Sequence, residues 1–200
     1  MKKLITICLV CVCVAALVTS STNAGVITIN GVDLFQGEVR SNGYTGEISA
    51  TTSGIPGVAD ATFGTFCVEL HENVYFGATY NAQVNTEAIH GGEAVSDPLD
   101  PKTAWLYDQF LTGGIVLTNN TERADFAEAV WMLEDEIPVV ATNTYYAQAL
   151  LSTWTDIGSI RILNLGTIED NFQYQDVLVP EPATIALLGL GALSLIRRKK

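Results

Sequence analysis

The chain has 200 residues, which is enough for one ordinary domain and too short for two of typical size. Its formal net charge is −12, although six of its ten basic residues lie at the two ends. Between the ends, residues 25–180 hold four basic and 21 acidic side chains, a formal charge of −17. This composition argues against nucleic-acid binding, which needs clustered Lys and Arg, and an anionic membrane surface would repel such a body.

The first 24 residues have the pattern of a secretory signal peptide. Two lysines precede an apolar stretch from Leu4 to Leu17, and small and polar residues follow it. This order is typical of export, with cleavage between Ala24 and Gly25. An uncleaved anchor is the alternative, but the apolar stretch is short for a membrane span.

Residues 25–178 are predicted to form a single acidic α+β domain. It is expected to be mainly antiparallel β, a sandwich or barrel with a helical insertion, flanked by an N-terminal signal helix and a C-terminal hydrophobic helix. The alternating residues 26–30 predict a strand that ends at the hairpin dipeptide Asn30-Gly31. Further strands are expected at 63–70, which is the strongest, and at 74–80, 159–165 and 174–179.

Three helices are expected in the middle of the chain. Asp100 as N-cap and Pro101 at the first helical position begin the first helix, which Gly113 ends. Asn120-Thr121-Glu122 begins the second, which ends before Pro138. The third is indicated by apolar residues at helical spacing: Ala147, Leu150, Leu151 and Trp154.

Residues 179–200 have three parts in a fixed order. Pro180, Glu181 and Pro182 come first, an apolar run from Ala183 to Ile196 follows, and a basic cluster ends the chain: Arg197, Arg198, Lys199 and Lys200. As a helix, the apolar run would rise about 21 Å, which is short of the roughly 30 Å hydrocarbon core. It therefore suits a temporary anchor whose basic end stays in the cytoplasm. An ordinary tail anchor is the alternative, and it does not explain the Pro-Glu-Pro sequence.

This C-terminal order resembles the PEP-CTERM sorting signal of bacteria that make exopolysaccharide. The resemblance implies recognition by an exosortase, an integral membrane cysteine protease-transpeptidase, with cleavage at or near Pro180-Glu181-Pro182. The mature protein would then be released to, or attached at, the cell surface or extracellular matrix. Exopolysaccharide and other matrix components are its expected partners there.

Cys67 is the only cysteine outside the signal peptide, so no disulfide can form within the body. On a strand, Cys67, Glu69 and His71 would share one face, where they could bind a metal or supply a thiol nucleophile. We favour a structural interpretation, with Cys67 buried and His71 on the surface, because no second Cys/His pair lies at ligand spacing. Neither a metal nor a cofactor is expected.

Two groups of carboxylates could bind calcium or support hydrolysis, namely Asp97 with Asp100 and Glu134-Asp135-Glu136. Neither group has the spacing of a calcium-binding loop. Two residues that are two positions apart on a helix also face different sides, so Glu134 and Glu136 would not act together. The sequence therefore predicts a solvated acidic face, and a secreted hydrolase is kept only as an alternative.

A second resemblance lies in residues 65–70, TFCVEL, and in residues 129–131, AVW. Both are similar to the thioester domains of bacterial surface adhesins. In that family the strand cysteine is joined to a glutamine four residues before the tryptophan as an internal thioester, which a surface amine opens to leave a covalent link. Ala127 stands at that position here and has no side-chain carbonyl, so Cys67 and Ala127 form a degenerate thioester position. The fold is expected without the bond.

These observations predict an exported surface or extracellular-matrix protein that an exosortase processes. Its role is expected to be structural or adhesive, associated with exopolysaccharide or biofilm, and not enzymatic. A covalent thioester adhesin, disfavoured by Ala127, and a secreted hydrolase are the alternatives. The protein would meet the exosortase transiently at the membrane. Its C-terminal helix would contact the membrane until processing.

Overall fold

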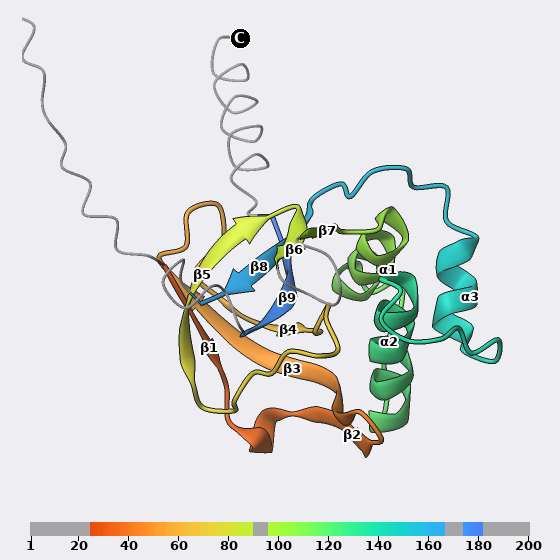
Figure 1. The fold of residues 1–200 in the computed structure, drawn as a ribbon, viewed down its shortest axis with the longest axis horizontal. Helices are drawn as coiled ribbons and strands as arrows, with labels where there is room; N and C mark the ends of the chain where they lie inside the picture. The colour runs from red at the N-terminus through yellow and green to blue at the C-terminus, as the bar shows by residue number, and fades with distance from the viewer. Residues whose placement is uncertain (1–24, 90–95, 167–173, 182–200) are drawn as a thin grey trace, which may run out of the picture.

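The computed structural model describes residues 25–89, 96–166 and 174–181. The expected signal peptide and the part of the sorting signal from Pro182 to Lys200 lie outside these ranges, and so do the cleavage residue Ala24 and the two flanking helices. Among the described residues, no helix is both long enough and apolar enough to cross a membrane. A curled β-sheet and a group of three helices beside it make up the described body (Figure 1).

A seven-stranded antiparallel sheet runs in the order β2-β3-β1-β5-β8-β9, with β4 paired to β3. The mainly antiparallel fold is thus confirmed, but a single sheet curls into a half-barrel in place of a two-sheet sandwich. A separate two-stranded ribbon pairs β6 with β7. The strands are β1 (Val26–Ile29), β2 (Gln36–Arg40), β3 (Gly43–Ser53), β4 (Thr62–Thr65), β5 (Thr79–Asn85), β6 (Glu87–Ile89), β7 (Ser96–Pro98), β8 (Ile160–Leu165) and β9 (Tyr174–Pro180).

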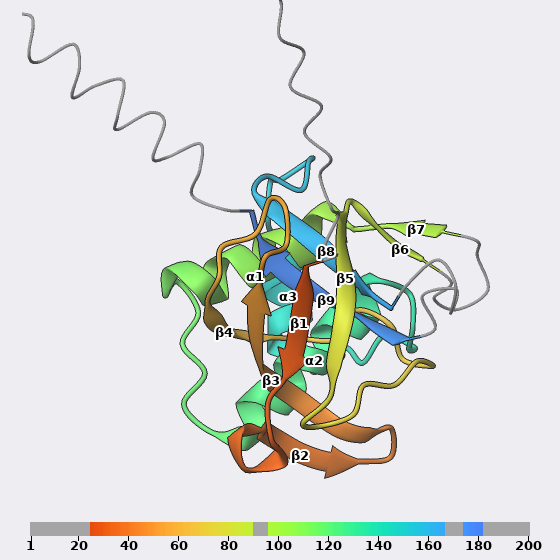
Figure 2. The same ribbon diagram turned by 90° about the vertical axis from the view of Figure 1, so that its left-hand side faces the viewer.

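The hairpin predicted at Asn30-Gly31 is wrong. A short 3-10 helix, η1 (Val32–Leu34), follows this dipeptide, and β1 lies between β3 and β5 (Figure 2). Both edges of β1 are therefore occupied by strands that are distant in sequence. Non-local pairing has overridden a local turn signal.

Two opposite ends of the sheet meet at a seam, formed by residues 66–68 and residues 176–178 of β9. Two backbone hydrogen bonds of 2.9 and 3.2 Å join these segments, and Cys67 faces Val177 in the antiparallel bridge between them. The strand expected at 63–70 is shorter than predicted. It corresponds to β4, which pairs with β3 only as far as Thr65, and the chain then continues along β9. The seam thus brings together residues that are more than a hundred positions apart.

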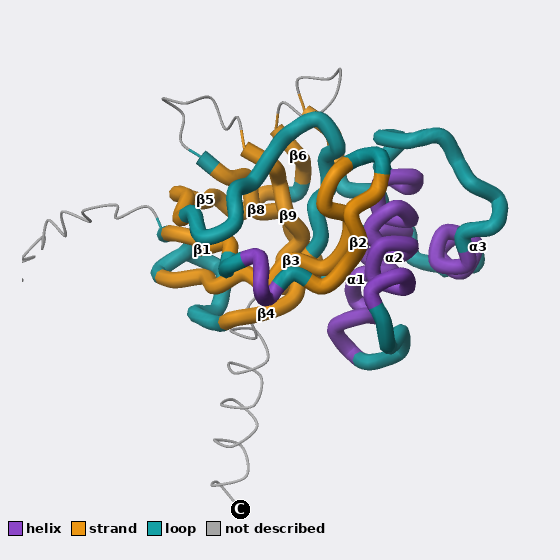
Figure 3. The backbone as a smooth tube through the Cα atoms, turned by 90° about the horizontal axis from the view of Figure 1, so that it is seen from below, coloured by secondary structure: helices purple, strands orange, loops and turns teal. Residues whose placement is uncertain are grey.

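The helical insertion is confirmed. Helices α1 (Pro101–Thr112), α2 (Asn120–Leu133) and α3 (Thr144–Leu150) follow β7 in sequence and lie together to one side of the sheet (Figure 3). The Asp100 side chain caps α1 as predicted, and Gly113 ends it with a positive φ of 77°. Helix α2 packs against β2 and β3, and α3 packs against α1 and α2.

The core has two clusters, one facing the helices and one lined by strands. Phe66, Val68 and Leu178 belong to the helix-facing cluster, whereas Cys67 and Val177 belong to the strand-lined one. Successive side chains of a strand point to opposite faces, which explains this alternation along the seam.

Candidate functional site

Cys67 lies half-buried at the seam, between two fully buried residues. Its side chain packs against the strand-lined cluster. Burial raises the pKa of the Cys67 thiol to about 12, so the sulfur is a protonated thiol at neutral pH. A reaction at this sulfur therefore needs a proton acceptor.

Gln175 of β9 is the polar side chain in contact with this thiol. Because Cys67 faces Val177, Gln175 is the diagonal neighbour of Cys67 on the same face of the seam. Its side-chain amide lies close enough to the thiol to offset part of the rise in the Cys67 pKa. Gln175 is only 5% exposed, and its Nε2 has no hydrogen-bond partner among the described residues. A buried amide N–H without a partner lowers the stability of the fold, so this arrangement indicates that the nitrogen has a functional role.

Cys67 and Gln175 line one cavity of about 180 Å³, here called the thiol cavity. Trp131 of α2 reaches it with an indole N–H that has no partner in the described part of the chain. Glu72 also lines it, with one carboxyl oxygen, Oε2, buried and similarly unpaired. Burial, helped by the charges of Asp176 and Glu136, raises the pKa of Glu72 to about 8. Thiol, amide, indole and carboxyl groups therefore share one small space.

Such a thiol and amide can combine as an internal thioester. The sulfur bonds to Cδ of Gln175, and the amide nitrogen leaves as ammonia. The leaving atom would be Nε2, which is the unpaired buried donor. Thioester formation would therefore remove an unsatisfied group from the interior.

Ala127 stands at the position where the family resemblance predicts the thioester glutamine. It lies in the helix-facing cluster with Phe66 and Phe126. Cys67 packs on the other cluster, so the missing carbonyl at position 127 does not decide which group meets the thiol. Sequence reasoning missed Gln175. A signal was present, since Gln175 and Asp176 are polar residues in the strand predicted at 174–179, but nothing in the local sequence linked Gln175 to Cys67.

Cys67, Glu69 and His71 do not gather into a site. Glu69 is fully buried, and His71 is exposed as predicted. No group of three His, Cys, Asp or Glu side chains among the described residues is arranged to hold a metal ion. Glu69 contacts Glu136, and its burial and this neighbouring carboxyl hold the pKa of Glu69 far above its ordinary value.

The solvated acidic face predicted for 134–136 is wrong for two of its three residues. Glu134 is 5% exposed and accepts a hydrogen bond from the backbone N–H of Asp100 at 3.3 Å, and burial raises its pKa to about 8. Glu136 is half-buried and accepts from the N–H of Leu70 at 3.0 Å. Because each carboxylate binds a different segment, the pair does not converge on a common substrate position.

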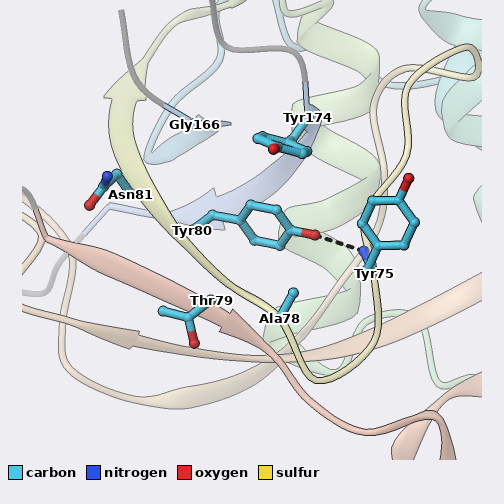
Figure 4. Close-up of a pocket in the computed structure, with 7 residues that line it drawn as sticks. All are labelled: Tyr75, Ala78, Thr79, Tyr80, Asn81, Gly166 and Tyr174. Carbon is cyan, nitrogen blue, oxygen red and sulfur yellow. Dashed lines mark hydrogen bonds between the residues drawn. The ribbon is translucent and has the colours of Figure 1, made fainter. Parts of the chain in front are cut away.

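A second pocket, of about 350 Å³, has an uncharged lining that includes three tyrosines (Figure 4). The hydroxyl of Tyr80 accepts a hydrogen bond from the backbone N–H of Tyr75 at 2.8 Å. The rings of Tyr80 and Tyr174 lie 4.7 Å apart. Tyr80 thus contacts Tyr174, the first residue of β9, which directly precedes Gln175.

The sorting motif begins inside the fold. Strand β9 continues to Pro180, which pairs with Ile160 of β8. The carboxylate of Glu181 forms an ion pair with Arg161, while Pro182 and the expected anchor and basic cluster lie outside the described residues. The first residues of the sorting signal are therefore held by the body.

Comparison with known proteins gives two matches. Residues 178–200 match the family model of the PEP-CTERM protein-sorting motif. The fold is similar to the N-terminal thioester domain of fibronectin-binding protein SfbI from Streptococcus pyogenes, with 10% sequence identity and a TM-score of 0.44, over 79% of this chain and 93% of that chain. No curated protein matches the sequence. Both resemblances stated from the sequence are thus found, and the motif implies an exported protein sorted by an exosortase.

Proposed function

We propose that this chain is an exported surface or extracellular-matrix protein whose body binds its target covalently through a thioester between Cys67 and Gln175. The observation that carries the proposal is the proximity of the Cys67 thiol to the buried amide of Gln175. The proposal revises the expectation of a body without the bond, which rested on Ala127 alone.

The bond forms without a cofactor. The thiol of Cys67 adds to Cδ of Gln175, the C–N bond breaks, and the thiol proton leaves with the nitrogen as ammonia. A primary amine on the target later attacks the same carbon, so that a stable amide forms and the Cys67 thiol is regenerated. Each molecule reacts once, and we therefore propose an adhesive or structural protein, not an enzyme.

Trp131 supports this chemistry. Its unpaired indole N–H is a donor only, and it lines the thiol cavity beside Gln175. The acyl oxygen gains negative charge when the carbon becomes tetrahedral, and a positioned donor in a water-poor site stabilises that charge. Trp131 is thus proposed to donate to this oxygen.

The two ends of the chain are proposed to carry its export and sorting signals. We propose that residues 1–24 direct export, that cleavage follows Ala24, and that an exosortase cuts at Pro180-Glu181-Pro182 after the apolar run has held the protein in the membrane. The match of residues 178–200 to the sorting motif supports this route. The proposed setting is the exopolysaccharide matrix or biofilm around the producing cell.

Intact mass spectrometry of the protein recovered outside the cell tests the thioester. The mass should be lower than that of the trimmed sequence by one ammonia, and it should rise to the adduct mass after incubation with methylamine. The variants Cys67→Ala and Gln175→Ala should show neither change, whereas Gln83→Ala, an exposed glutamine on β5, should behave as wild type. A full sequence mass with no amine adduct would leave a matrix protein that binds without covalent chemistry.

The sorting route has its own test. The C-terminal residue of the mature protein should lie at or near the Pro-Glu-Pro motif, and full-length protein should accumulate in a strain that lacks the exosortase. Recovery of external protein with Lys200 still present would overturn the proposed route.

A further inference from the structure

We propose that Glu72 is the proton acceptor for the attacking amine at the Cys67–Gln175 thioester, and that it makes the site react preferentially with protonated primary amines such as lysine side chains. This inference rests on the proposed function and adds a residue and a selectivity to it.

The position of Glu72 supports this role. Glu72 shares the thiol cavity with Cys67 and Gln175, and a volume of about 180 Å³ holds little more than one extended alkylamine. Its Oε2 is buried and has no hydrogen-bond partner among the described residues. A carboxyl oxygen beside a reactive cavity that has no partner of its own is available to an incoming N–H group.

The mouth of the cavity favours a cation. Phe35, Tyr44 and Phe76, here called the aromatic trio, line the cavity and contact one another edge to face, with ring centroids 5.2–5.7 Å apart. Tyr44 is 56% exposed, so the trio reaches solvent. Aromatic faces attract ammonium groups, and a body with a formal charge of −17 attracts cations as a whole.

The proton transfers balance. A lysine-type ammonium carries one proton too many to attack, and the Glu72 carboxylate takes that proton to become a carboxylic acid. The neutral nitrogen then bonds to the acyl carbon of Gln175 and the C–Sγ bond breaks. The second proton lost by the nitrogen goes to Sγ of Cys67, so that an amide, a thiol and a carboxylic acid are the products.

The electrostatics of Glu72 suit this transfer. Burial raises its pKa to about 8, with smaller contributions from Asp176 and Glu136. Near pH 8 about half of the Glu72 side chains are carboxylates, and a carboxylate with a raised pKa is a stronger base than an exposed one. General-base catalysis is most effective when the pKa lies near the working pH. The groups that surround Glu72 therefore prepare it to remove a proton from an ammonium group.

Two nucleophiles separate this role from a structural one. Cadaverine is a protonated alkylamine at neutral pH, whereas hydroxylamine is mostly neutral and needs no proton removed before it attacks. The rate of each reaction with the mature protein recovered outside the cell would be followed by intact mass. Glu72→Gln should lower the ratio of the cadaverine rate to the hydroxylamine rate by about tenfold or more.

Controls keep the result interpretable. Glu72→Asp keeps a carboxylate and should recover part of the lost selectivity, and Glu87→Gln on β6, away from the thiol cavity, should leave the ratio unchanged. An unchanged ratio in Glu72→Gln, with the ammonia loss still present, would overturn this inference alone. Loss of the thioester in Glu72→Gln would also overturn it, because Glu72 would then act in forming the bond. Absence of ammonia loss in the wild type would instead refute the proposed function on which it rests.

Discussion

Arg161 and Glu181 form an ion pair in which Nη2 lies 2.5 Å from Oε1. The contact fastens the middle residue of the Pro-Glu-Pro motif to β8, and the backbone N–H of Glu181 also donates to the carbonyl of Ser159, directly before β8. A protease needs an extended and accessible chain, so a motif that is bonded to the body is presented in a restricted form. Folding of the body and processing of the signal are therefore physically connected.

Arg161→Gln should accelerate cleavage at the motif, because it releases the Glu181 carboxylate from β8. The ion pair is partly exposed, so the variant should lose only about 1 kcal/mol of stability or less. Pulse-chase labelling of the full-length and trimmed forms measures the rate. Arg123→Gln breaks the ion pair with Glu47, far from the motif, and should leave processing unchanged. Cleavage that is equally fast or slower in Arg161→Gln would contradict this prediction.

Local signals in the sequence located the first two helices well, whereas α3 (Thr144–Leu150) ends before Leu151 and Trp154, which were expected to belong to it. Asp100, Pro101 and Gly113 describe the beginning and end of α1 because capping depends on neighbours within a few residues. The strand at 26–29 followed from alternation, and those at 160–165 and 174–180 lie close to the segments expected at 159–165 and 174–179.

Long-range pairing was not visible in the sequence. Strand β1 pairs with β3 and β5, and nothing at Asn30-Gly31 indicates that both edges of β1 are occupied by these strands. The contact of Cys67 with Gln175 depends on the seam, which forms only after the sheet has curled. Glu134 was predicted to be solvated because acidic residues are rarely buried unless paired. Its burial follows from tertiary packing.

The stability of the protein should fall as pH rises from about 5 toward alkaline values, where ordinary unfolded carboxyl groups are already ionised. Glu69 keeps its proton in the folded state, since it is buried among Glu136, Asp176 and Asp97. A raised pKa in the folded state means that the stabilisation is complete at low pH and is lost as pH rises through that value. The slope from one such group is at most about 1.4 kcal/mol per pH unit.

Denaturant unfolding at a series of pH values measures this dependence. Glu69→Gln carries no charge at any pH, so its stability should vary less with pH than that of the wild type. The control Glu87→Gln should keep the wild-type slope. Stability that increases between pH 5 and pH 9 in the wild type would contradict the prediction.

Phe66→Ala should destabilise the fold by about 3–5 kcal/mol, the range for a fully buried phenylalanine. Its ring lies 4.5 Å from that of Phe126 and 5.3 Å from that of Phe110, so the substitution opens a void between the seam and the helices. Leu151→Ala, at a position that is 83% exposed, should change stability by only a few tenths of a kcal/mol. Chemical denaturation gives both values, and a Phe66→Ala loss below that of Leu151→Ala would show that the helix-facing cluster does not stabilise the fold.

Trp131→Phe separates the role of the indole N–H from that of the ring. Phenylalanine keeps an apolar ring on α2 and removes a buried donor that has no partner among the described residues, so the cost in stability should be small. If the indole stabilises the acyl oxygen, aminolysis of the thioester should slow by about tenfold or more, because that donor acts only when the carbon becomes tetrahedral. Cadaverine and hydroxylamine should be slowed alike, since both pass through the same oxyanion, whereas Glu72→Gln affects mainly cadaverine. Equal aminolysis rates in Trp131→Phe and wild type would assign Trp131 to packing alone.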